Sequence, residues 1–116
     1  MANDKHKTKQ PDLDRVIHEP ARLQIISYLA TAGPGVSFTE ISQKLDLTAG
    51  NLSVQLKRLE EADYLTIDKS FKDNRPLTSV TITRTGLEAL KKYLVEMETM
   101  ISRLKATMPV QQTEKR

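Results

Sequence analysis

The sequence predicts a mainly α-helical domain with a small β-hairpin, which is an α+β fold. Several segments repeat apolar residues at the spacing of one helix face. Two short segments near the middle alternate apolar and polar residues, as half-buried strands do. The last third of the chain repeats apolar residues in heptads, which is typical of a long helix that pairs with another.

Length and composition narrow the class of protein. With 116 residues, the chain is long enough for one compact core. The absence of cysteine excludes disulfides and thiolate metal sites, and two histidines, His6 and His18, are too few for a metal site. No segment resembles a signal peptide or a membrane span, so we expect a soluble cytoplasmic protein with no membrane partner. A net charge of +3 is compatible with a nucleic-acid partner but does not require one.

The N-terminal third contains a tail and one or two helices. Residues 1–11 are polar and basic, which predicts a disordered tail or an arm that touches DNA. Asp12–His18 has apolar residues at helical spacing and is predicted to be a short helix. Pro20 suits the first turn of the next helix, which ends before the breaker cluster at 33–35.

Two further helices follow in close succession. Ser37, with Glu40 three residues later, forms a capping-box pattern that begins the first of them. A short connection follows Leu45, and Thr48 caps a helix that runs to about Ala62. The apolar stripe of this helix is its core face and consists of Leu52, Leu56 and Leu59.

A hairpin is predicted next. Residues 64–69 and 79–83 alternate as strands, and the polar segment 71–76 is the turn between them. We expect Val80 and Ile82 to pair against Leu65 and Ile67.

The final helix begins at Thr83 or Thr85 and runs to about Thr107. The segment from Thr85 to Glu88 has the pattern of a second capping box. Seven apolar residues on this helix form an unbroken heptad seam, and we expect a second copy of the chain to cover it. The alternative is that the seam packs against its own domain. The seam comprises Leu87, Leu90, Leu94, Met97, Ile101, Leu104 and Met108.

The order of elements is that of a helix-turn-helix followed by a hairpin. The segments HEPARLQIISYLA, SFTEISQKLDLTAGNLSVQLKRLEEADYLT and PLTSVTITRTGLEAL carry a resemblance over Pro20 to Gly86. This part resembles the winged helix-turn-helix domain of MarR-like and ArsR-like regulators, and with the flanking helices the resemblance covers about residues 13–104. The chain departs from the pattern at Asp63, where such domains usually have glycine, because a left-handed residue is needed there.

The resemblance implies a division of the chain and a function for each part. Residues 12–84 would be the DNA-binding domain, 85–108 the dimerisation helix and 109–116 a polar tail. It also implies that a ligand can lie between the terminal helices and the DNA-binding domain, although no residue in the sequence identifies an effector. The missing cysteines exclude the thiolate metal sensing that many ArsR-like proteins use.

The helix that begins after Thr48 is the predicted recognition helix, which enters the major groove. Its face opposite the core stripe carries small, polar and cationic residues, and its first amides are expected to form a phosphate seat. Glu60, Glu61 and Asp63 lie at the far end and are expected to point away from the DNA. The predicted DNA-binding residues of this helix are Thr48, Gly50, Asn51, Ser53, Val54, Lys57 and Arg58.

The hairpin is the predicted wing, and its cations are expected to reach phosphates or the minor groove. Over residues 48–76 the cations are matched by as many acids, so we expect modest affinity per domain and dependence on dimer avidity. The predicted DNA-binding residues of the wing are Lys69, Lys72, Asn74 and Arg75.

These features predict a homodimeric, sequence-specific, double-stranded-DNA-binding regulator of transcription. The alternative is a winged helix used for protein–protein contact or as an architectural DNA-binding module. No nucleophile elbow, phosphate loop or metal spacing is present in the sequence, so we expect neither an enzyme nor a cofactor.

Overall fold

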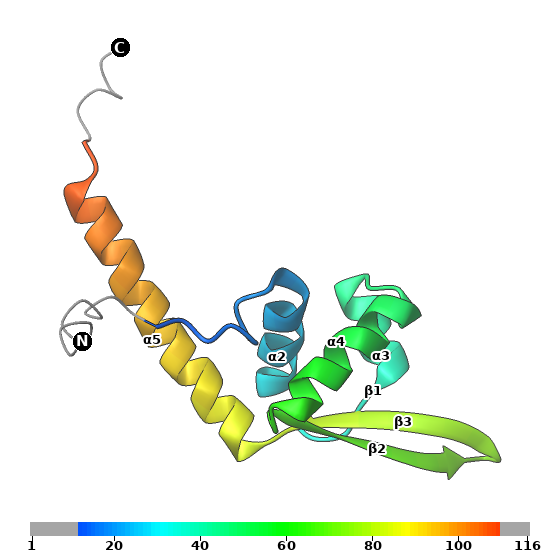
Figure 1. Cartoon of the computed structure of the whole chain (residues 1–116). Helices are drawn as coiled ribbons and strands as arrows, with labels where there is room; N and C mark the ends of the chain where they lie inside the picture. The colour runs from blue at the N-terminus through cyan, green and yellow to red at the C-terminus, as the bar shows by residue number, and fades with distance from the viewer. Residues whose placement is uncertain (1–11, 110–116) are drawn as a thin grey trace.

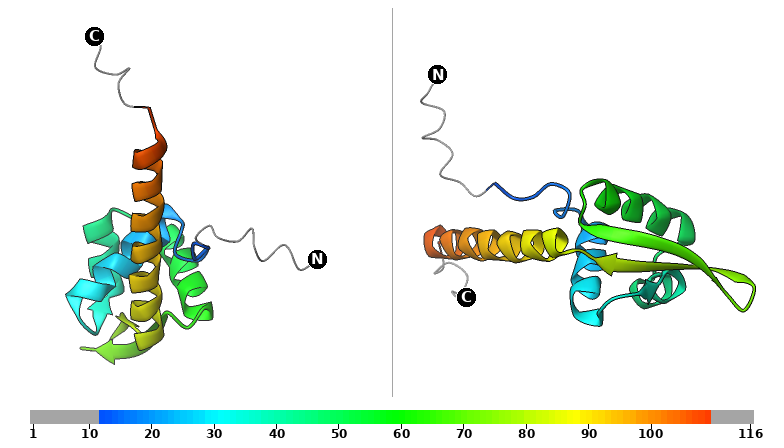
Figure 2. Two further views of the ribbon diagram at one scale, coloured as in Figure 1. Left: turned by 90° about the vertical axis from the view of Figure 1, so that its left-hand side faces the viewer. Right: turned by 90° about the horizontal axis from the view of Figure 1, so that it is seen from below.

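The structure is a computed structural model that describes residues 12–109. In it, three helices gather at one end of a β-hairpin, and a fourth, longer helix projects away from them (Figure 1). The hairpin tip extends on the side of the body opposite to the long helix (Figure 2). The elements in chain order are α2 (Pro20–Ala32), β1 (Val36–Ser37), α3 (Phe38–Leu45), α4 (Ala49–Glu61), β2 (Leu65–Lys72), β3 (Arg75–Ile82) and α5 (Arg84–Thr107).

The segment before α2 is a turn, so the predicted short helix over Asp12–His18 is wrong. The Asp14 carboxylate accepts hydrogen bonds from the amides of Val16 (2.8 Å) and Ile17 (3.1 Å), which favours a turn over a continued helix. Glu19 is extended, with φ −153° and ψ 130°, as expected for a residue before proline. Pro20 therefore separates this segment from α2 and occupies the first position of that helix, as predicted.

The two helices of the helix-turn-helix begin at the predicted caps. Ser37 Oγ accepts from the amide of Glu40 (3.0 Å), but the Glu40 carboxylate accepts from the Tyr28 hydroxyl instead of reaching back to the Ser37 amide. The reciprocal half of the predicted capping box is therefore replaced by a contact to α2. Asp46, at φ 55°, ends α3, and Thr48 Oγ1 caps α4 by accepting from the amide of Asn51 (3.1 Å).

The sheet is antiparallel with the strand order β1–β3–β2, and β1 was not predicted. The predicted pairing is confirmed, because Leu65 lies opposite Ile82 and Ile67 opposite Val80. The predicted turn over residues 71–76 is too long. Asp73 and Asn74 both have positive φ, 53° and 63°, so a two-residue turn of the kind that matches hairpin twist closes the strands.

The start of α5 is fixed by Thr83 and not by Thr85. Thr83 Oγ1 accepts from the Gly86 amide (2.9 Å), while its hydroxyl donates to the Asp63 carbonyl (2.7 Å). Gly86 lies so close to Tyr64 that an added Cβ would be 2.1 Å from the Tyr64 carbonyl oxygen. The predicted box that begins at Thr85 is therefore not the cap, and glycine is required where α5 crosses the chain before β2.

One apolar core joins all of these elements. Ile17 and Tyr93 belong to it, and the His18 Nδ1 and Tyr93 hydroxyl are 2.7 Å apart, which ties the N-terminal turn to α5. None of the helices within residues 12–109 combines the length and the hydropathy that a bilayer span requires. The buried core residues are Ile17, Ile25, Ile26, Leu29, Val36, Ile41, Leu52, Leu56, Leu59, Leu65, Val80, Leu90 and Tyr93.

Candidate nucleic-acid interface

Helix α4 has one buried face and one exposed face, as the sequence predicted. The predicted core stripe is confirmed, because Leu52 and Leu59 are fully buried and Leu56 is 2% exposed. All the predicted DNA-binding residues of this helix and its cap are exposed: Thr48, Gly50, Asn51, Ser53, Val54, Lys57 and Arg58. Glycine at position 50 has open space around it, so a ligand backbone can approach closely there.

The N-terminus of α4 offers fewer free amides than expected. The Asn51 amide is already bonded to Thr48 Oγ1, so it is not available to a phosphate. Among residues 48–51, the amides of Thr48, Ala49 and Gly50 have no hydrogen bond within the described part of the chain and remain as possible donors. The phosphate seat expected over residues 48–51 thus loses the Asn51 donor, and the seat itself stays a prediction.

The exposed face of α4 divides into two flanks. Ser53 and Lys57 line a groove of about 530 Å³ between α4 and the hairpin, together with Lys69 of β2. Asn51 and Arg58 lie on the other flank, toward α2, because they precede and follow Gln55, which bonds to that helix. Val54 projects between the flanks and is 55% exposed.

The acids at the end of α4 are not all directed away from this surface. Glu60 lines the same groove as Lys57, so it reduces the positive charge there. Glu61 follows Val54 by seven residues, which places it on the same exposed face, two turns further along. Glu60 shares this groove with Lys57 because a helix places residues three apart on one side, and the expectation that the acids point away from DNA stays a prediction.

All four predicted wing residues are exposed on the hairpin, and three of them lie at its tip. Lys72 and Arg75 pair across the strands next to the turn, and Asn74 is in the turn itself. Lys69 lies closer to the body and faces the α4 groove. Because both strands extend to the turn, Lys72 and Arg75 lie on the paired strands and not in the longer loop predicted over residues 71–76.

The wing also exposes a large apolar side chain that the sequence analysis missed. Phe71 is 75% exposed and lies opposite Pro76, at the tip of the hairpin. Its position two residues after Lys69 puts it on the face of the ribbon that carries Leu65 and Ile67 near the body. The alternation of β2 carries this signal, because the strand continues to Lys72 and includes the first residues of the predicted turn.

A hydrogen-bonded chain links α2 to the exposed flank of α4. Arg22 Nη1 donates to Gln55 Oε1 (2.7 Å), and Gln55 Nε2 donates to Asn51 Oδ1 (3.0 Å). Arg22 Nε also donates to the Val16 carbonyl (2.6 Å), so the N-terminal turn is part of the same arrangement. Neither Arg22 nor Gln55 was predicted, because their sequence separation of 33 residues gives no sign that they meet.

The structure divides the predicted heptad seam of α5. Leu90 is 5% exposed and belongs to the core of its own domain, whereas Leu87 and Met97 are half-buried. The inner part of the seam thus follows the alternative reading, in which it packs against its own domain. The other four seam residues are exposed, by 49% for Leu94, 46% for Ile101, 53% for Leu104 and 57% for Met108.

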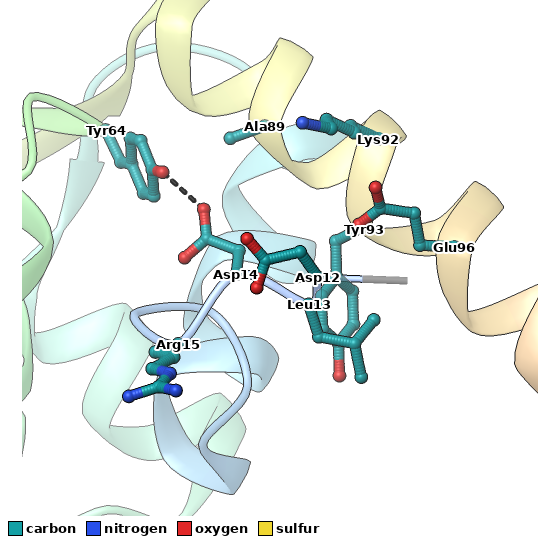
Figure 3. A pocket seen from close by; sticks show the side chains of 9 residues that line it. All are labelled: Asp12, Leu13, Asp14, Arg15, Tyr64, Ala89, Lys92, Tyr93 and Glu96. Carbon is teal, nitrogen blue, oxygen red and sulfur yellow. Dashed lines mark hydrogen bonds between the residues drawn. The ribbon is translucent and has the colours of Figure 1, made fainter. Parts of the chain in front are cut away.

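A cavity of about 530 Å³ separates the N-terminal turn from α5 (Figure 3). Asp14 accepts a hydrogen bond from the Tyr64 hydroxyl at one end of it. Burial, together with that hydrogen bond, raises the pKa of Tyr64 to about 12. Lys92 and Glu96 of α5 line the opposite wall, so the cavity has the position that the resemblance implied for a ligand and a mixed-charge lining.

Comparison with known proteins identifies the family. A family model described as "Winged helix DNA-binding domain" matches residues 21–101. The uncharacterized protein MJ0432 of Methanocaldococcus jannaschii is 33% identical over 86 residues, which cover 72% of this chain and 89% of that protein.

Solved structures agree with this match. A transcriptional regulator homologue from Pyrococcus horikoshii OT3 has a TM-score of 0.73 and 32% identity, covering 90% of this chain and 98% of that one. MarR of Staphylococcus aureus, solved with salicylate and kanamycin, shares the fold with a TM-score of 0.64 and 21% identity over 97% of this chain and 67% of that one.

The family and the fold are those of DNA-binding transcriptional regulators and not of enzymes. The sequence-based prediction of a winged helix-turn-helix with a long C-terminal helix is confirmed. The chain belongs to the family of winged helix DNA-binding domains, with the architecture of MarR-like regulators of transcription.

Proposed function

We propose that this chain binds double-stranded DNA sequence-specifically as a homodimer and thereby regulates transcription. The observation that carries the proposal is the exposed face of α4, where small and polar residues occupy the first two turns and cations flank them. Such a face approaches base edges closely and reaches phosphates at its margins. The hairpin stands beside it with Lys72 and Arg75 near its tip, in reach of the adjoining backbone (Figure 2).

Homodimerisation is supported by the outer part of α5. Leu94, Ile101 and Leu104 repeat at the heptad spacing and are about half exposed, while the helix projects beyond the body of its own domain (Figure 1). A second copy of the same helix is a complementary cover for such a seam. A twofold dimer would present two α4 helices to DNA, so the predicted site is a pseudo-palindrome with half-sites about one helical turn apart.

The test is a selection of bound duplexes from a random DNA pool, at low and at moderate salt. Enrichment of a pseudo-palindrome that persists at moderate salt supports the proposal. Binding without enrichment that vanishes with salt indicates an architectural role. Absence of binding at both salt concentrations favours the protein-contact alternative.

A pair of double variants tests the reading surface directly. Ser53→Ala combined with Lys57→Ala is expected to weaken binding to the selected site by about 2 kcal/mol, since base and phosphate contacts are both removed. The matched control, Ser27→Ala with Lys91→Ala, removes the same groups from exposed positions on α2 and α5. Equal affinity of the two double variants would show that the groove flank of α4 does not read DNA.

A further inference from the structure

The hydrogen bonds from Arg22 through Gln55 to Asn51 run in one direction, from donor to acceptor, and this direction (the polarity of the chain of bonds) is fixed. A guanidinium group has only donors, so the atom of Gln55 that meets Arg22 Nη1 must be its oxygen, at 2.7 Å. The NH₂ group of Gln55 is then directed to Asn51, whose oxygen accepts it at 3.0 Å. The remaining group of Asn51, its own NH₂, is the one left to face outward.

Asn51 is placed where this polarity matters for recognition. It is the third residue of α4 and is exposed, and the N-terminal residues of a recognition helix are those that contact base edges. Arg22 and Gln55 are partly buried behind it, and Arg22 is held further by the Val16 carbonyl at 2.6 Å. The series of hydrogen bonds therefore ends in the NH₂ group of Asn51, a donor that is oriented by groups within the domain.

We propose that Arg22, acting through Gln55, orients Asn51 so that its NH₂ group faces the DNA, and that this orientation selects the base it reads. The inference rests on the proposed function and specifies the chemistry of one position in the half-site. An unrestricted asparagine reads adenine with one donor and one acceptor. With its oxygen directed at Gln55, Asn51 presents its NH₂ group to the base, which favours a base that offers only acceptors in the major groove: guanine, or thymine through O4. Arg22 and Gln55 are positioning residues in this scheme.

The experiment is the duplex selection described above, repeated with variants of the chain. Wild-type protein is expected to select guanine or thymine at one position of each half-site. Asn51→Ala is expected to lose the preference at that position, keep the rest of the site, and bind it roughly tenfold more weakly. If Asn51→Ala selects the same base with the same strength, the inference is wrong. If wild-type protein enriches no sequence, the proposed function fails and the inference fails with it.

The substitution Gln55→Glu reverses the direction of the hydrogen bond between residue 55 and Asn51. The introduced carboxylate accepts from Arg22 and from the Asn51 NH₂ together, so the Asn51 oxygen turns outward. The preferred base is expected to change to cytosine or adenine, whose N4 or N6 groups donate. The added negative charge also weakens binding overall, so base preference is the readout. Gln43→Glu, at an exposed position on α3, makes the same chemical change and is expected to leave the preference unaltered. An unchanged preference with Gln55→Glu overturns the inference.

Two variants of Arg22 separate positioning from a structural role. Arg22→Met removes the anchor, so the Gln55 amide turns freely and the preference at this position is expected to broaden. Arg22→Lys supplies another group that only donates, and it is expected to retain the preference. Both variants lose the fork geometry that Arg22 uses with Val16 and Gln55, so both are expected to lower the melting temperature. Full preference in Arg22→Met, or equal broadening in both variants, shows that Arg22 does not set the polarity.

Discussion

The two parts of helix α5 have the same sequence pattern and different surroundings. From Arg84 to Tyr93 the helix lies against its own domain, with Gly86, Leu90 and Tyr93 buried. From Leu94 to Thr107 it contains no buried residue, and every residue from Ile101 to Thr107 is exposed. The heptad spacing continues through both parts without a break.

The comparison shows that a repeat specifies a surface and not its partner. Leu90 and Leu104 are equivalent by spacing, but one is 5% and the other 53% exposed. The first stabilises the folded monomer by removing apolar area from water. The second can contribute in the same way only when another surface covers it. The inner and outer parts of α5 are therefore expected to respond differently to the same substitution.

The largest effect is expected at Gly86, where the inner part of α5 crosses Tyr64, the residue before β2. Gly86→Ala would place a Cβ 2.1 Å from the Tyr64 carbonyl oxygen, so α5 must shift and lose packing at Leu90 and Tyr93. We expect a loss of more than about 3 kcal/mol in the free energy of unfolding, measured by denaturant titration. The matched substitution is Gly50→Ala, because a Cβ at position 50 meets open space and alanine has the higher helix propensity. It is expected to raise the free energy of unfolding by up to about 1 kcal/mol. Similar losses at both glycines would contradict the crowding at Gly86.

The direct comparison of the two parts uses the same substitution in each. Leu90→Ala is expected to cost about 2 to 3 kcal/mol in unfolding free energy at any protein concentration, because it leaves a cavity in the core. Leu104→Ala is expected to cost almost nothing in the dilute monomer and to weaken self-association in sedimentation equilibrium. If Leu104→Ala leaves self-association unchanged, the exposed seam is not the dimer interface.

A smaller effect is expected at the turn that precedes the crossing. Asp63 has φ 66°, the left-handed conformation that glycine adopts without a Cβ penalty. Asp63→Gly is expected to raise the unfolding free energy by roughly 0.5 to 1 kcal/mol. Asp68→Gly, in the extended strand β2, is expected to lower it instead. A destabilised Asp63→Gly protein would mean that the carboxylate has a role beyond the backbone.

The last effect is confined to alkaline pH. Burial and the Asp14 hydrogen bond raise the pKa of Tyr64 to about 12 in the folded chain, above the ordinary value of 10.0. The folded state therefore holds this proton more tightly than the unfolded state, and the stabilisation is complete below pH 10 and lost between about pH 10 and 12. Tyr64→Phe is expected to flatten that part of the stability–pH curve. Identical slopes for wild type and Tyr64→Phe in this range would show that Tyr64 is not coupled to folding.

Much of the fold was predictable because the signals are local. The caps at Ser37 and Thr48 act on amides three residues away, and the pairing of Leu65 with Ile82 follows from alternation alone. The left-handed residue expected at position 63 is also found, although it is aspartate. The residues proposed to read DNA on α4 were predicted from helix periodicity, and all are exposed.

The remaining features depend on contacts that the sequence does not encode locally. Gly86 is required because the Tyr64 carbonyl lies against it, and Glu40 bonds to Tyr28 because α2 and α3 pack together. The short helix predicted before Pro20 gives way to a turn held by Asp14, which the Tyr64 hydroxyl also contacts.

The residues alone indicate which faces of the helices are apolar, where α2, α3 and α4 begin, and how the hairpin strands pair. Those properties follow from spacing and from hydrogen bonds within a few residues. The tertiary structure is needed to show that the inner part of the heptad seam packs against its own domain, whereas Ile101, Leu104 and Met108 are exposed. It is also needed to show that Arg22 donates to Gln55 and Gln55 to Asn51. Burial and side-chain contacts at these positions are set by atoms of elements distant along the chain, which helix periodicity does not specify.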